Sequence, residues 1–124
     1  MLEETHDMEY LLLLYSDETL AGRMKPEELR PIFGEFEAVT TDIKNKGQLK
    51  HSGALQSTGT ATTVRVREGK RMTTDGPFAE TKEQLGGYYL IDVKDLDEAI
   101  AIATRIPTSR FGCVEVRPLM KMTR

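Results

Sequence analysis

Residues 8–15 read MEYLLLLY, a short run of aliphatic and aromatic residues that is too short to span a bilayer. Side chains alternate between the two faces of a β-strand, so this run predicts a strand that is apolar on both faces. One face would carry Tyr10, Leu12 and Leu14, and the other would carry Leu11, Leu13 and Tyr15. A strand of this kind belongs in the centre of a sheet that is covered on both sides.

The rest of the chain divides into helical and extended patterns around this strand. Hydrophobic spacing and turn residues predict a helix over 26–46, a strand over 48–56, a hairpin of strands over 62–67 and 70–74, an irregular stretch over 75–84, a strand over 87–93, a helix over 95–106 and a strand over 113–119. Without the hairpin, the order is β-α-β-β-α-β, which is the order of the ferredoxin-like unit.

The first helix has an apolar stripe with a spacing of three and four residues. Because Pro31 would interrupt this helix, we expect the regular helix to begin near Pro31 and residues 26–30 to form a looser turn. The stripe consists of Leu29, Ile32, Phe33, Phe36, Val39 and Ile43.

The second helix has clear start and stop signals. Asp95 is a good N-cap, Glu98 completes a pattern that resembles a capping box, and Pro107 ends the helix. The predicted buried stripe consists of Leu96, Ala99, Ile100, Ala103 and Ile106.

We therefore predict an α+β fold: an antiparallel ferredoxin-like sheet with two helices on one face and an inserted β-hairpin. Residues 1–7 are treated as a flexible extension and residues 8–124 as a single domain. Two helices cover only one face of such a sheet. A second copy of the chain is the simplest cover for the other face, so we expect a homodimer formed through the sheet.

Composition narrows the class of protein. The 124 residues carry a formal net charge of −3, which disfavours nucleic acid as the main partner. There is no apolar run of membrane-spanning length and no signal-peptide pattern, so we expect a cytoplasmic protein without a membrane partner. One cysteine and two histidines predict neither an intrachain disulfide nor a metal site, and no cofactor motif is present.

The stretch over 73–83, TTDGPFAETKE, is the most informative for function. Glycine escapes the steric restriction on the residue before a proline, so Gly76-Pro77 is a natural bend. Asp75 has two interpretations here. It either holds the turn through backbone hydrogen bonds, or it places a carboxylate at the mouth of a cleft as a general base or ligand anchor.

This stretch resembles the YCII-related family, and more closely its branch with the DGPF motif. The resemblance extends over almost all of residues 8–119. It is carried by Thr63-Val64-Arg65, Thr74 to Glu83, Leu85 to Tyr89, Asp95 to Ala99, Ile106-Pro107 and Val114 to Pro118. It implies a ferredoxin-like domain that dimerises through its sheet. Related domains occur alone or attached to extracytoplasmic-function sigma factors.

The resemblance also implies a possible chemistry. Some members of the family resemble dehydrochlorinases or isomerases, and a histidine–aspartate pair is proposed as their catalytic centre. Asp75 matches the aspartate. The histidine stands in an Arg-Pro-x-His pattern, where this chain has Phe33 after Arg30-Pro31-Ile32. A phenyl ring transfers no proton, so the pair is incomplete here.

Other candidate residues are weighed from their chemistry. His51 could replace the missing histidine, or it could be a half-exposed strand residue without a role. Tyr88 and Tyr89 should point to opposite faces of their strand, and Lys82 could assist a ligand or form local ion pairs. The candidate catalytic residues are Asp75 and His51, and the candidate ligand-binding residues are Asp75, Gly76, Pro77, Phe78, Lys82 and Tyr88.

Three functions fit these residues. The first is a small-molecule binding or sensing domain without turnover. The second is an acid–base enzyme, such as a lyase, an isomerase or a dehydrochlorinase, that uses Asp75. The third is a protein-interaction module, with a transcription factor as a possible partner, in which the basic hairpin residues Arg65, Arg67, Lys70 and Arg71 could contact an acidic surface.

Overall fold

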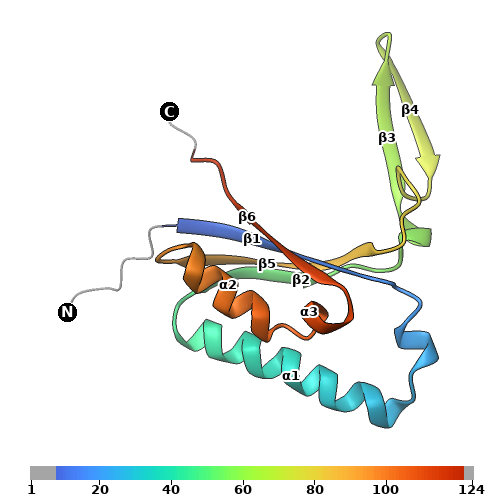
Figure 1. Cartoon of the computed structure of the whole chain (residues 1–124). Helices are drawn as coiled ribbons and strands as arrows, with labels where there is room; N and C mark the ends of the chain where they lie inside the picture. The colour runs from blue at the N-terminus through green and yellow to red at the C-terminus, as the bar shows by residue number, and fades with distance from the viewer. Residues whose placement is uncertain (1–7, 122–124) are drawn as a thin grey trace.

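The computed structural model describes residues 8–121; the predicted extension over residues 1–7 lies outside the described residues. Four antiparallel strands form one sheet in the order β2-β5-β1-β6, and β3 and β4 form a separate two-stranded sheet (Figure 1). This is the ferredoxin-like order with an inserted hairpin, as predicted. The strands are β1 (Met8–Ser16), β2 (Leu49–Ala54), β3 (Thr62–Arg67), β4 (Lys70–Asp75), β5 (Gln84–Val93) and β6 (Cys113–Pro118).

The helices lie on one side of the four-stranded sheet (Figure 1). The two main helices are α1 (Pro26–Asn45) and α2 (Leu96–Arg105), at the places predicted for them. Three short elements were not predicted because each is only one turn long: α3 (Thr108–Phe111), η1 (Ala21–Arg23) and η2 (Thr58–Thr60).

Strand β1 is central, as its two apolar faces predict. It pairs with β5 along its whole length and with β6 over Tyr10 to Tyr15. Its alternation places Leu12 and Leu14 in the core, whereas Leu11 and Leu13 are half-buried on the other face. The core contains twelve buried side chains: Tyr10, Leu12, Leu14, Val39, Ile43, Tyr89, Ile91, Val93, Ala99, Ile102, Ala103 and Ile106.

The regular part of helix α1 begins earlier than predicted. It runs without a break through Pro31, so the expected looser turn over residues 26–30 is wrong. Pro26 occupies the first helical turn, where the missing N–H costs nothing, and the Lys25 backbone N–H donates to the Glu28 carboxylate at 2.9 Å. Pro31 itself is exposed, so water can hydrogen-bond the carbonyl that loses its helical partner.

The buried faces of both helices are narrower than the predicted stripes. Asp95 caps α2 through the Glu98 N–H at 2.9 Å, as predicted, but Leu96 and Ile100 are nearly half exposed. Ile102 is buried in the core instead, together with Ala99, Ala103 and Ile106 of the predicted stripe. In α1, Phe33 is 61% exposed rather than part of the core. Each helix therefore buries a narrower face than its apolar spacing predicts.

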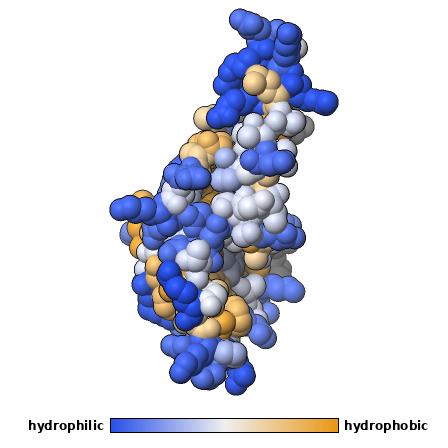
Figure 2. All heavy atoms as spheres, turned by 90° about the vertical axis from the view of Figure 1, so that its right-hand side faces the viewer, coloured by the Kyte–Doolittle hydropathy of each residue, from blue (hydrophilic) through white to orange (hydrophobic). Residues whose placement is uncertain are grey.

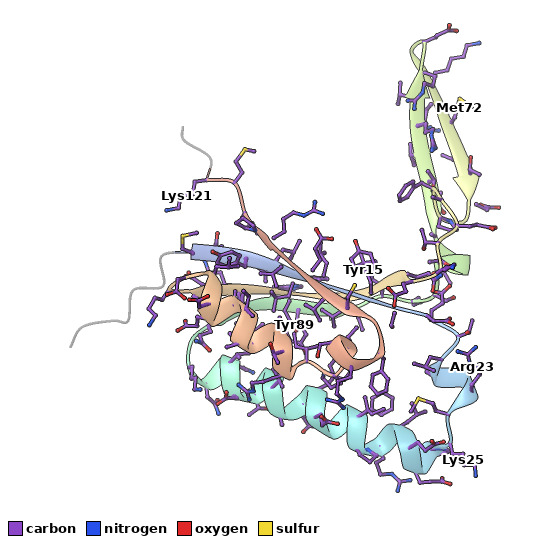
Figure 3. All side chains as sticks on the ribbon, viewed as in Figure 1. Tyr15, Arg23, Lys25, Met72, Tyr89 and Lys121 are labelled. Carbon is purple, nitrogen blue, oxygen red and sulfur yellow. The ribbon has the colours of Figure 1, made fainter. Side chains whose placement is uncertain are left out.

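The side of the sheet away from the helices is called the open face here. By strand register it carries Leu11, Leu13 and Tyr15 of β1, Tyr88 and Leu90 of β5, and His51 of β2. The same register places four charged residues on it: Glu9, Asp92, Glu115 and Arg117. None of the described helices covers it, and Figure 3 shows Tyr89 on the opposite, helical side. The open face therefore combines an apolar patch of Leu11, Leu13 and Leu90 with charged residues around it, and none of the described helices covers it.

The β3–β4 hairpin has the predicted position and turn. Glu68 and Gly69 both have positive φ angles, 52° and 75°, which is the backbone of a two-residue hairpin turn. The hairpin stands away from the sheet on the side of the open face (Figure 1). Viewed from its own end of the molecule, it is largely hydrophilic, with hydrophobic atoms exposed between the charged ones (Figure 2).

Within residues 8–121, no helix is both long and apolar enough to cross a membrane. The same residues contain no group of three or more histidine, cysteine, aspartate or glutamate side chains that could hold a metal ion.

The turn into β6 predicts a strong requirement for glycine. A Cβ on Gly112 would lie 2.0 Å from the Tyr15 carbonyl oxygen and 2.9 Å from the Ser16 Cα, both backbone atoms of the central strand. Gly112→Ala should lower the free energy of unfolding by about 3 kcal/mol or more in urea titrations. Gly34→Ala, at an open position of α1, is the matched control and should raise it by up to about 1 kcal/mol. Equal effects of the two substitutions would contradict this packing.

The contact between α1 and α2 predicts a loss of stability in acid. Hydrogen bonds from Arg105, at 2.7 Å, and from Lys46 hold the pKa of Asp42 below its ordinary value of 3.8. A carboxylate with a lowered pKa in the folded state stabilises the fold above its unfolded pKa, and this contribution disappears as the pH falls through the folded pKa. Asp42→Asn should therefore make the urea midpoint less dependent on pH below about pH 4. Arg105→Ala should also make the urea midpoint less dependent on pH. An unchanged pH profile in both variants would contradict a stabilising contact between Asp42 and Arg105.

Candidate functional site

A cavity of about 610 Å³ lies between α1 and the helical side of the sheet, at the end where β2 and β5 lead to the hairpin. Strand alternation places Leu14, Ser52 and Tyr89 on this side, and α1 contributes Phe33 and Phe36. The complete lining is Leu14, Ser16, Ala21, Phe33, Phe36, Ser52, Gly53, Ala54, Leu55, Gly86, Gly87, Tyr88, Tyr89 and Thr108.

The cavity exists partly because small residues face it. Gly87 pairs with Ala54 across β5 and β2, so two neighbouring positions of its floor have at most a methyl group. A Cβ on Gly87 would lie 2.8 Å from the Gly53 carbonyl oxygen, a backbone atom, so this position accepts only glycine. The strands therefore approach closely here and leave space beneath Phe33 and Phe36.

The lining combines apolar side chains with hydroxyl groups. Ser16, Ser52 and Thr108 supply hydroxyls, whereas the Tyr89 hydroxyl is already hydrogen-bonded to the Thr40 hydroxyl at 2.8 Å. The described residues that line it include no carboxylate, amine, guanidinium, imidazole or thiol. Chemically, the cavity can enclose a ring and accept or donate hydrogen bonds through hydroxyls, but it holds no strong acid or base.

A smaller hollow of about 180 Å³ adjoins the cavity and shares Phe33, Phe36 and Thr108 with it. Asp17 is one of the residues that line this smaller hollow. Hydrogen bonds from the Thr19 hydroxyl and backbone N–H, and then the charge of Arg23, lower the pKa of the Asp17 carboxyl. This carboxylate already has protein donors, so its role is to fix the loop after β1.

The DGPF bend lies at the base of the hairpin, outside the cavity. The Gly76 N–H donates to the Ala61 carbonyl at 2.7 Å, and its own carbonyl accepts the Thr63 hydroxyl at 2.8 Å. Gly76 has a φ of +98°, so glycine is required by the bend. Asp75 ends β4 opposite Thr62 and is exposed.

The remaining predicted residues of this segment point to solvent. Phe78 is 78% exposed, and Pro77 and Lys82 are exposed as well. Pro77 lines a separate hollow of about 290 Å³ together with Thr58, Gly59, Ala79, Glu80, Thr81 and Gln84. Asp75, Gly76, Phe78 and Lys82 line neither this hollow nor the cavity.

His51 has Tyr88 as its partner on the open face. The Tyr88 hydroxyl lies 2.6 Å from His51 Nδ1, and the two rings stack at 14° with their centroids 5.7 Å apart. Gly53 makes room for this stack, because a Cβ there would lie 2.9 Å from Tyr88 Cε1. The described hydrogen bonds thus join His51 to a tyrosine and not to Asp75.

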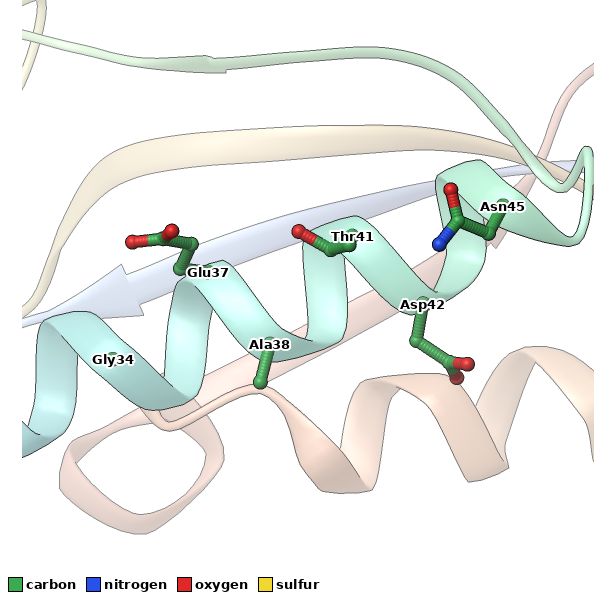
Figure 4. A pocket seen from close by; sticks show the side chains of 6 residues that line it. All are labelled: Gly34, Glu37, Ala38, Thr41, Asp42 and Asn45. Atoms are coloured by element: carbon green, nitrogen blue, oxygen red, sulfur yellow. The ribbon is translucent and has the colours of Figure 1, made fainter.

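A groove of about 580 Å³ runs along α1, but it is not enclosed. All six residues that line it belong to α1, so no second element closes it (Figure 4). Asp42, at one side of the groove, is bound by Arg105 and Lys46. We therefore assign the candidate site to the cavity between α1 and the sheet.

The structure brings together different residues from those predicted. Of the predicted site residues, only Tyr88 is among the lining residues, although its side chain lies on the open face against His51. The strongest missed member is Phe33, which its spacing in the first helix predicts as part of the buried stripe. The signal in the sequence is that Phe33 stands at the histidine position of the Arg-Pro-x-His pattern. The hydroxyls of Ser16, Ser52 and Thr108 carry no sequence signal of their own.

Comparisons with known proteins point in one direction. Residues 8–123 match the family described as "YCII-related domain". An uncharacterized protein of Rhizobium meliloti (strain 1021) is 40% identical over 114 residues, which cover 90% of this chain and 92% of the relative.

The close approach of the Tyr88 ring to Gly53 predicts that substitutions at these two positions are coupled. Gly53→Ala should lower the free energy of unfolding by about 1–3 kcal/mol, because the new methyl group clashes with the Tyr88 ring. In a Tyr88→Ala background the same substitution should cost much less, since the ring is gone. Urea titrations of the four proteins measure this coupling. Equal costs in both backgrounds would contradict the contact. Gly59→Ala is the control, because a Cβ there would make only an ordinary contact with the Ser57 Oγ, at 3.8 Å.

Proposed function

The chain belongs to the family of YCII-related domains, and within this family we propose that it binds a small, uncharged, largely apolar molecule without converting it. The observation that carries the proposal is the cavity of about 610 Å³ between α1 and the sheet. Its described lining has aromatic, aliphatic and hydroxyl groups and no strong acid or base. Such a lining provides affinity and orientation rather than proton transfer.

Cavity size and polarity define the class of ligand. Small-molecule sites have volumes of roughly 300–1,000 Å³, and this cavity falls within that range. Phe33 and Phe36 offer ring surfaces, and the hydroxyls of Ser16, Ser52 and Thr108 offer hydrogen bonds. The proposed ligand has one or two rings and a neutral hydroxyl or carbonyl group. A charged group would lose its water without gaining an ionic partner.

Phe33 supports binding rather than turnover. The resemblance to YCII-related proteins places a histidine at this position, where a proton could be transferred. In this chain the position holds a phenyl ring that lines the cavity. An aromatic contact between this ring and a ligand ring stabilises the complex but moves no proton.

The acid–base alternative depends on Asp75, which is exposed at the base of the hairpin and does not line the cavity. If the protein were an enzyme of that kind, Asp75→Asn would remove a factor of roughly 10²–10⁴ in rate. Detection of any such turnover would favour that alternative over binding alone.

We also propose that the domain is a homodimer formed through the open face. Leu11, Leu13 and Leu90 are half-buried there, and the helices occupy the other side of the sheet. A two-fold symmetric pair would bury the same surface of each copy. The ligand cavities would remain on the outer, helical sides of the two sheets.

The binding proposal predicts a preference for neutral ligands. Phenol should raise the melting temperature saturably and bind at least about tenfold more tightly than benzoate, because no cation compensates the buried carboxylate. Ala54→Trp should fill the cavity and abolish the phenol response, whereas Ala101→Trp, at an exposed position of α2, should preserve it. Thermal shifts and calorimetric titration measure these effects.

Phe33→Ala should weaken phenol binding by roughly 2–12-fold through loss of the aromatic contact. Because Phe33 is 61% exposed, the unliganded protein should keep its stability. A phenol response that survives Ala54→Trp unchanged, or benzoate binding as tight as phenol binding, would refute the cavity as the site.

A further inference from the structure

We propose that the β3–β4 hairpin is an arm that packs against the flank of a second copy of the chain seated on the open face. This proposal rests on the homodimer proposed above and adds a contact outside the sheet-to-sheet surface. Four properties of the hairpin support it: its missing core, its direction, its length and its charge.

The hairpin has no core of its own. All twelve residues of β3 and β4 are exposed except Thr63, which is half-buried at its base. Val64, Val66 and Met72 are each more than half exposed, and Phe78 follows in the adjoining bend. A two-stranded hairpin without packing is at best marginally stable in water. These apolar side chains therefore need a cover that the described chain does not provide.

The direction of the hairpin points to the place of that cover. Its base is attached to the domain: Gly76 and Ala61 are joined through their backbones, and the Glu18 carboxylate binds the Thr58 N–H at 2.9 Å. From this base the hairpin rises on the side of the open face, away from the helices, and Figure 3 shows Met72 far above the sheet.

The length of the hairpin matches this role. Strands of six residues extend roughly 20 Å, whereas packed sheets lie only about 10 Å apart. A second sheet on the open face would thus lie within reach of the hairpin. Val64 and Val66 share one face of the hairpin, opposite Met72, and this face would pack against the side of the second copy. The hairpin would extend beyond the layer of the second sheet.

Charge favours a copy of the same chain as the occupant. Residues 65–71 contain Arg65, Arg67, Lys70 and Arg71 with one acid, Glu68, so they contribute +3. The whole chain has a net charge of −3, so the remaining residues carry −6. A basic arm on an acidic body is attracted to the body of a second copy. Nucleic acid, the other partner of basic ribbons, would be repelled by that body.

The test compares dimerisation of the wild-type chain and three double variants by sedimentation equilibrium. The double variant Val64→Ser/Val66→Ser should weaken the dimer by roughly tenfold or more, because two valines lose their buried contacts. The matched control, Leu96→Ser/Ile100→Ser, removes two exposed apolar side chains of α2 on the helical side and should leave the dimer unchanged. A charge reversal, Arg65→Glu/Arg67→Glu, keeps the valines and should also weaken the dimer, more strongly at low salt.

A second measurement locates the arm directly. A spin label is attached to Met72→Cys in a Cys113→Ser background. This protein is mixed with ¹⁵N-enriched chains that carry no spin label. Broadened signals in the enriched chains then arise only between copies. We expect broadening from the label at residue 72 and none from a label at Asp97→Cys on α2.

The outcomes separate the two proposals. A dimer that tolerates both hairpin variants and shows no broadening between copies overturns the arm but leaves the sheet-face dimer intact. A monomeric wild-type chain overturns the dimer and the arm together. If Leu13→Asp abolishes the dimer and the hairpin variants weaken it, both proposals are supported.

Discussion

The structure depends on the position of β1 between β5 and β6. This strand pairs along both edges, so its backbone groups are satisfied within the sheet, and its side chains must be placed on two faces. Leu12 and Leu14 join the core under the helices, while Leu11 and Leu13 form the open face. One strand thereby determines both the core of the domain and the surface proposed for its partner. Gly112 belongs to the same constraint, since the turn into β6 crosses directly against Tyr15.

The candidate site results from a mismatch between helix and sheet. Helix α1 extends past the core at its first half, where Phe33 and Phe36 stand over a part of the sheet that has glycine and alanine at Gly87 and Ala54. The cavity is the space between the large side chains of α1 and the small residues of the sheet. The groups with stronger acid–base character, Asp75 and His51, lie elsewhere: one at the base of the hairpin and one on the open face against Tyr88. The proposed binding cavity and the side chains capable of proton transfer are thus spatially separated in the described chain.

The two proposals use opposite sides of the sheet. The cavity opens on the helical side, and the dimer and the hairpin arm use the open face. A ligand that moves α1 could affect the dimer only through the shared strands, of which β2 and β5 carry both His51–Tyr88 and the cavity floor. The hairpin leaves the sheet at this same end, so the cavity, the open face and the arm converge on the ends of β2 and β5.

The sequence by itself determined the order of the elements, the central place of β1, the cap at Asp95, the turn at Glu68-Gly69 and the opposite directions of Tyr88 and Tyr89. These features depend on neighbours in the chain: alternation, helical period and local hydrogen bonds. Only the tertiary structure decided that Phe33 lines a cavity, that Ile102 replaces Leu96 and Ile100 in the core, that α1 continues through Pro31, and that His51 meets Tyr88. A periodic pattern states where a side chain points relative to its own backbone, but what lies opposite depends on distances between elements far apart in sequence.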